Sequence, residues 1–108
     1  MRLIVAVLKP SQVEVVRQSL ASVHVTRLTI CDAQGYDFAP SAGGQFQQAL
    51  VQQSVVEIAV NDDFVDRTVD MIAAALGSDR GDLDERLFVM PIDDAVQIYR
   101  EVRGPEAV

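Results

Sequence analysis

Apolar residues occur along the chain in short runs that predict strands. A continuous apolar run over residues 3–8 ends at Lys9-Pro10, as expected for a strand buried within a sheet. Residues 25–31 and 55–60 alternate and are rich in β-branched side chains, which predicts two more strands. Further along the chain, residues 87–92 predict a fourth strand and residues 95–99 a short edge strand.

Two other segments carry apolar residues at helical spacing. The first predicts a helix over residues 13–22, with a capping box formed by Ser11 and Glu14. The second predicts a helix over residues 64–76, with Asn61 as its N-cap. The order βαββαβ predicts a ferredoxin-like α+β fold, in which a four-stranded antiparallel sheet carries two helices on one face.

Residues 36–53, between the two alternating runs, differ from both. They contain Pro40, the pair Gly43-Gly44 and five glutamines, and they show no sustained period. A loop this long in a small domain is usually functional or disordered. We predict that it is mobile and reaches solvent or a partner, and that Phe46 and Leu50, four residues apart, form a short helical anchor on that partner.

Composition and charge exclude several classes of partner. The chain has 108 residues, enough for a single domain over residues 1–108 with its own core. Its formal charge of −7 argues against nucleic acid and against an anionic membrane surface. The apolar run at residues 3–8 is too short to span a membrane, so we expect no membrane insertion and a cytoplasmic protein.

Candidate catalytic and metal-binding groups are few. His24 is the single histidine and Cys31 the single cysteine, and neither has a partner at a catalytic or metal-binding spacing. The acidic cluster Asp82, Asp84 and Glu85 misses the spacing of a calcium loop. No Walker or GxGxxG pattern is present. The sequence therefore predicts no catalytic residue and no metal site.

Several segments together resemble the PII signal-transduction family of nitrogen regulators. They are Leu3 to Pro10, Leu28-Thr29-Ile30 followed by Gly35-Tyr36, residues 56–63, and residues 86–89 with Asp94-Ala95-Val96. The resemblance covers nearly the whole chain in order and spacing. It implies a homotrimer with nucleotide clefts between subunits. It also implies that the long loop, about residues 37–53 and called the T-loop in that family, binds a target such as a membrane transporter or a regulated enzyme.

The resemblance also assigns candidate site residues. It implies that an adenine nucleotide (ATP, ADP or AMP) is bound by Thr29, Gly35, Tyr36, Glu57 and Arg86. The partner-binding residues of the loop are expected to be Phe38, Gln45, Phe46 and Leu50.

The chain departs from the family pattern at positions that bind effectors. Phe46 stands where the family places its modifiable tyrosine, and a phenyl ring has no hydroxyl to accept a uridylyl group. Ala39 and Gln53 stand where the family places the glutamine and lysine that hold 2-oxoglutarate, so we expect no 2-oxoglutarate binding. Gln97 and Tyr99 stand where the family places two arginines. Their lack of positive charge, together with the acidic residues Asp82, Asp84 and Glu85, should weaken polyphosphate binding.

Three functions remain open from the sequence. The first is a non-catalytic PII-like trimer that senses a nucleotide weakly or atypically and regulates a protein partner. The second is a small enzyme or metal-handling protein on the same trimeric scaffold. The third is a structural trimer without a ligand.

Overall fold

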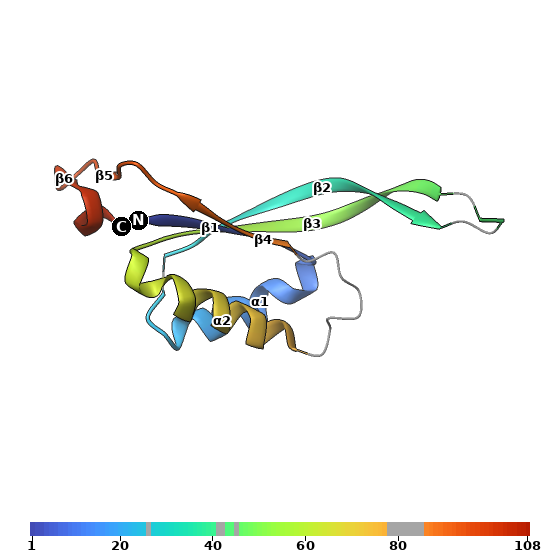
Figure 1. Cartoon of the computed structure of the whole chain (residues 1–108), viewed down its shortest axis with the longest axis horizontal. Helices are drawn as coiled ribbons and strands as arrows, with labels where there is room; N and C mark the ends of the chain where they lie inside the picture. Colours follow the sequence, from blue (N-terminus) through green and yellow to red (C-terminus); the bar gives the residue numbers. More distant parts are fainter. Residues whose placement is uncertain (26, 41–42, 45, 78–85) are drawn as a thin grey trace.

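The fold is built on one antiparallel sheet of four strands, in the spatial order β2-β3-β1-β4. The computed structural model describes residues 1–25, 27–40, 43–44, 46–77 and 86–108. The strands of the sheet are β1 (Arg2–Leu8), β2 (Thr29–Pro40), β3 (Phe46–Val60) and β4 (Arg86–Pro91). Two helices, α1 (Val13–Ala21) and α2 (Val65–Leu76), pack together on one face of the sheet (Figure 1). The predicted ferredoxin-like α+β fold is therefore confirmed.

The core lies between the sheet and these two helices. Alternate strand residues point toward the helices because successive side chains of a strand point to opposite faces. The buried apolar side chains are Ile4, Ala6 and Leu8 of β1, Val56, Ile58 and Val60 of β3, Val16 and Leu20 of α1, and Ile72 of α2. None of the described helices is long and apolar enough to cross a membrane.

The opposite sheet face, called here the uncovered face, is also apolar. On β1 it carries the half-buried residues Leu3, Val5 and Val7. On β4 it carries Phe88 and Met90, which are 47% and 42% exposed. Both described helices lie on the other face (Figure 1), so one chain leaves these side chains without a covering layer.

Strands β2 and β3 are longer than the sequence predicts. β2 begins at Thr29 rather than at residue 25, and it continues through Pro40. β3 begins at Phe46, nine residues before the predicted start at residue 55. Most of the predicted loop is thus a two-stranded ribbon, defined here as residues 33–40 paired with residues 46–53. The ribbon projects from the body and accounts for much of the 58 Å length of the molecule (Figure 1).

The predicted helical anchor at Phe46 and Leu50 is therefore wrong. Both residues belong to β3, where their backbone groups pair with Pro40 and Tyr36 of β2. Main-chain hydrogen bonds form this ribbon, and they do not require alternation of apolar and polar side chains when both faces meet solvent. This is why the sequence showed no period in the segment.

Both predicted helix caps are also wrong. The side chain of Gln12 accepts a hydrogen bond from the backbone N–H of Lys9 at 3.0 Å, because a 3₁₀ turn, η1 (Pro10–Gln12), precedes α1. Glu14 bonds to the side chains of Arg17 and Gln18 instead of returning to Ser11. Asn61 precedes a second 3₁₀ turn, η2 (Asp62–Phe64), without a side-chain cap.

The helix ending and the C-terminal segment complete the chain. Gly77 ends α2 with a φ of +47°, a backbone conformation that favours glycine. The predicted edge strand at residues 95–99 is wrong: β5 (Val96–Gln97) pairs with β6 (Val102–Arg103) in a separate two-stranded sheet. A 3₁₀ turn, η4 (Gly104–Ala107), follows.

An ion pair links the two sides of the β5–β6 hairpin. The guanidinium of Arg103 donates to the Asp94 carboxylate at 2.6 Å from Nη2 and 3.2 Å from Nε. This hydrogen bond lowers the pKa of Asp94 below its usual value. The bond stabilises the hairpin above the unfolded-state pKa, and that contribution is lost as the pH falls through the lower folded-state pKa.

We therefore expect the carboxyl carbon of Asp94 to titrate at a lower pH than an Asp in an unstructured peptide, when followed by NMR. Arg103→Ala should raise that midpoint toward the usual Asp value near 4. Arg100→Ala, a change of the same type in the same hairpin, should leave it unmoved. An unchanged midpoint in Arg103→Ala would contradict the ion pair.

Candidate functional site

The predicted nucleotide-binding residues Thr29 and Glu57 lie opposite each other on two adjacent strands. Thr29 is the first residue of β2, and the antiparallel register sets it directly opposite Glu57 of β3. Glu57 is also opposite Val5 of β1, which is in turn opposite Phe88 of β4. These four positions form one row across the uncovered face. The Glu57 carboxylate can accept hydrogen bonds, the Thr29 hydroxyl can donate or accept them, and both lie beside an apolar surface. This arrangement suits a ligand with a flat ring and polar edges.

Gly35 and Tyr36 lie farther along β2. Gly35 is the sixth residue after Thr29, which corresponds to about 20 Å along a strand. Tyr36 follows Gly35 and points to the opposite face, where it is 65% exposed. Within one chain these two residues do not join Thr29 and Glu57.

Arg86 is separated from Thr29 and Glu57 as well. It is the first residue of β4, opposite Val7 of β1, and it is exposed. It also lines an apolar pocket of about 170 Å³ between α2 and the ends of β1 and β4. The predicted set therefore comprises one adjacent pair, Thr29 and Glu57, and three residues at a distance from it.

Three of the four predicted partner-binding residues, Phe38, Phe46 and Leu50, belong to the ribbon. Leu50 is 52% exposed and lies opposite Tyr36. The backbone of Phe38 is paired with that of Gln48, and the backbone of Phe46 with that of Pro40. Gln45 lies outside the described residues. Because Tyr36 and Leu50 are directly opposite each other in the register, they fall on one face of the ribbon.

Gln53 packs against Gly35 at the base of the ribbon. A Cβ added at position 35 would lie 2.5 Å from Gln53 Oε1, so the amide occupies the space that a side chain there would need. Gln53 is the position where the family resemblance places a lysine. Here a neutral amide lies across the backbone of β2, and it supplies no positive charge for a carboxylate ligand.

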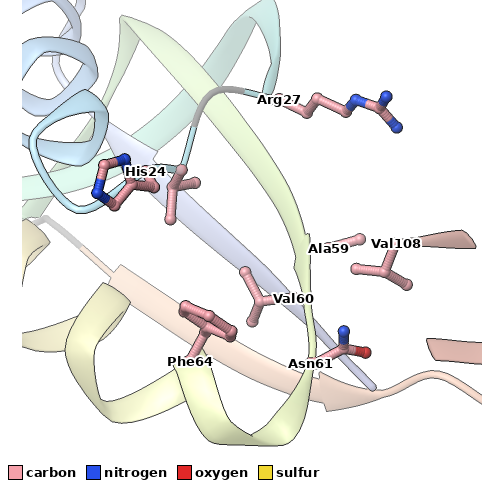
Figure 2. Close-up of a pocket in the computed structure, with 8 residues that line it drawn as sticks. His24, Arg27, Ala59, Val60, Asn61, Phe64 and Val108 are labelled. Atoms are coloured by element: carbon pink, nitrogen blue, oxygen red, sulfur yellow. The ribbon is translucent and has the colours of Figure 1, made fainter. Parts of the chain in front are cut away.

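A pocket of about 240 Å³ lies where the chain enters β2 and β3 ends. It is lined by His24, Val25, Arg27, Ala59, Val60, Asn61, Phe64 and Val108. Figure 2 shows the side chains of His24 and Arg27 directed to opposite sides of this pocket, so they do not converge on a common anion. None of the predicted site residues lines it. Sequence reasoning missed it because residues 25–27 were assigned to a strand.

Asn61 is the one lining residue with an unusual hydrogen-bond state. Its Nδ2 donates to the carbonyl of Pro105 at 3.1 Å. Its Oδ1 is buried and has no hydrogen-bond partner among the described residues. A buried acceptor of this kind is costly unless something donates to it. The side chain thus ties the end of β3 to the C-terminal turn instead of capping η2.

The structure gives no metal centre in the part of the chain that it describes. No group of three or more His, Cys, Asp or Glu side chains gathers there. Cys31 is a free, exposed cysteine on β2. The acidic cluster Asp82, Asp84 and Glu85 lies outside the described residues.

Comparison with known proteins identifies the family of the chain. The sequence profile described as nitrogen regulatory protein P-II matches residues 1–102. The chain is 31% identical to the nitrogen regulatory protein P-II of Rhizobium etli, over the full length of both proteins. It is 29% identical to the nitrogen regulatory protein GlnK1 of Methanosarcina mazei, covering 100% of this chain and 97% of that protein. The chain thus belongs to the P-II family of nitrogen regulatory proteins, whose members are non-catalytic signal transducers.

Proposed function

We propose that this protein is a homotrimeric P-II regulator that binds an adenine nucleotide between subunits and acts on a protein partner through its ribbon. The observation that carries the proposal is the uncovered face, an apolar surface that contains Thr29 and Glu57. Apolar strand residues of this kind are normally covered, and a second copy of the chain is the simplest cover. A ring of three copies would cover this face while leaving the ribbons projecting.

The separation of the candidate residues supports a site shared between copies. One chain brings only Thr29 and Glu57 together, while Gly35 is about 20 Å away along β2. A neighbouring subunit would have to supply the remaining contacts. In such a cleft Glu57 accepts hydrogen bonds from hydroxyl or amino groups of the nucleoside, and Thr29 orients the base. Arg86 is the main contact to the phosphates.

The charge distribution favours a nucleotide with few phosphates. Arg86 is one cation, and the sequence that precedes it contains Asp82, Asp84 and Glu85. At the C-terminal hairpin, Gln97 is half-buried and Tyr99 is fully exposed, and neither carries a positive charge. Repulsion from these acidic side chains lowers the affinity for ATP more than that for ADP or AMP, because ATP carries the most negative charge. We therefore propose a weaker preference for ATP than a pair of phosphate-binding arginines would give.

The ribbon is the proposed partner-binding element, with a transporter or a metabolic enzyme as the class of target. We expect that the ribbon neither takes part in binding 2-oxoglutarate nor accepts a uridylyl group. Ala39 has no oxygen that ligates a metal, Gln53 has no charge, and Phe46 has no hydroxyl. Loss of one charge-assisted hydrogen bond costs about 1.5–3 kcal/mol, or roughly ten- to a hundredfold in affinity.

Isothermal titration of the purified protein with ATP, ADP and AMP, with and without Mg²⁺, tests this proposal. We expect binding of at least one nucleotide, weakened about tenfold or more by Glu57→Gln and by Arg86→Ala. Arg80→Ala, the same change nearby in the sequence, should have a smaller effect than Arg86→Ala. Absence of binding by all three nucleotides would favour a structural trimer. Micromolar 2-oxoglutarate binding with Mg-ATP would contradict the assignment of Ala39 and Gln53.

A further inference from the structure

We infer that the free edge of β3 in the ribbon binds its partner by accepting an extended, uncharged peptide strand. This inference rests on the proposed function, in which the ribbon contacts the partner, and it adds how the contact is made. The free β3 edge is defined as the side of residues 46–53 that faces away from β2.

The register of the sheet exposes this edge. The last pair between β1 and β3 joins Leu8 to Ser54, and β1 ends there. β3 extends eight residues beyond that pair to Phe46, and along this stretch β2 is its partner on one side. Among the described residues no strand pairs with the other side. A row of main-chain N–H and C=O groups is therefore available to another strand.

The other two sheet edges carry features that discourage strand addition. The outer edge of β2 includes the charged residues Asp32 and Asp37, with Gly35 between them and Pro40 at its end. β4 is six residues long, begins with Arg86 and ends with Pro91. Charges, proline and short length are the usual means by which proteins block edge strands.

The free β3 edge has none of these features. Its residues are Phe46, Gln47, Gln48, Ala49, Leu50, Val51, Gln52 and Gln53, without a charge, a proline or a glycine. In a chain with 23% charged residues, such a stretch is a favourable template for an added strand. The contrast with the edges of β2 and β4 makes this edge the one suited to a partner strand.

The charge of the ribbon indicates the chemistry of the added strand. Between Ala33 and Val56, Asp37 is the single charged residue, although the chain carries a net charge of −7. From Ser54, the last residue paired with β1, to Phe46 the strand runs eight residues, or about 26 Å, which is about three Debye lengths at physiological salt. The charges of the acidic body are therefore largely screened at the outer part of the ribbon. Desolvating a charged side chain beside Leu50 and Val51 would be unfavourable, so we infer an uncharged segment.

A random heptapeptide library, displayed on phage and panned against the full-length wild-type protein, tests the inference. We expect the selected peptides to be poor in charged residues and proline and rich in strand formers. Their affinities, measured by fluorescence anisotropy, should fall at least tenfold in Gln48→Lys, because the lysine lies on the strand that the peptide would join. Gln34→Lys is the matched control, the same change at an exposed position on β2, one strand farther away, and it should change the affinity less than twofold.

A second pair of variants tests the backbone itself. Neighbouring residues of a strand present their N–H groups to opposite edges, so one of Gln48→Pro and Ala49→Pro removes an N–H from the β2 ladder and the other removes one from the free edge. The variant that retains the β2–β3 amide protection in hydrogen exchange should lose peptide binding at least tenfold.

Three results would overturn the inference: no selected peptide, equal effects of Gln48→Lys and Gln34→Lys, or full binding by the proline variant that retains the ribbon. Growth of the wild-type protein into particles larger than a trimer, reduced by Gln48→Lys, would also overturn it, because the edge would then bind a second copy. The trimer and the nucleotide titration test the proposed function separately, so each can fail without the other.

Discussion

Replacing Val5 by aspartate should convert the proposed trimer into a folded monomer. Val5 lies at the centre of the uncovered face, between Glu57 of β3 and Phe88 of β4. In an assembly that covers this face, a new carboxylate would be buried next to Glu57 without a cation. An unpaired buried charge costs on the order of 4 kcal/mol, which lowers an association constant on the order of a thousandfold. Light scattering should give about three times the 11.8 kDa chain mass for the wild type and a single chain mass for the variant.

The matched control for this prediction is Val15→Asp. Val15 lies on α1 and is 44% exposed, so the same substitution there adds a charge on the helical side of the molecule. This variant should remain a trimer. Circular dichroism should show that both variants keep their helix and strand content, because neither side chain belongs to the buried core. A wild-type monomer at micromolar concentration would contradict the trimer, and a trimeric Val5→Asp would contradict its location on this face.

Truncating Ile72 to alanine should cause a large loss of stability. Ile72 of α2 is 1% exposed and packs between the helix pair and the sheet. Removing a buried isoleucine to alanine typically costs about 2–5 kcal/mol, from lost transfer energy and from the cavity left behind. The apolar pocket of about 170 Å³ beside Ile72 enlarges that cavity. Small domains are stable by only about 5–15 kcal/mol, so the loss should be obvious in urea denaturation.

Ile72→Val provides the graded control for the core. It removes one methyl group and should cost about 0.5–1.5 kcal/mol. Both variants need to be compared with the wild type at one protein concentration, since subunit association contributes to apparent stability. A cost below about 1 kcal/mol for Ile72→Ala would mean that the helix does not pack on the sheet as described.

The outcome at the ribbon shows where sequence reasoning stops. The sequence distinguished residues 36–53 from the rest of the chain, and most of the ribbon lies within this segment. It did not indicate that most of this segment pairs into strands. Periodicity reports which side chains are buried, and among the ribbon residues whose burial the structure describes none is fully buried. The helical interpretation of Phe46 and Leu50 failed for this reason, since residues four apart share a face in a strand as well as in a helix.

The sequence by itself determined the order of elements, the fold class and the absence of a catalytic motif, because these follow from local periods of hydrophobicity and from residue types. Only the tertiary structure decided which strands are neighbours, that Thr29 lies opposite Glu57, and that Gly35 is distant from both. It also decided that Asn61 bonds to Pro105 instead of capping a helix. Register and long-range hydrogen bonds join residues far apart in the chain, and a one-residue shift in register reverses the face of every side chain. Local hydrophobic patterns indicate which face of each strand is buried, but the packing of the whole sheet against its helices determines which residues lie opposite each other.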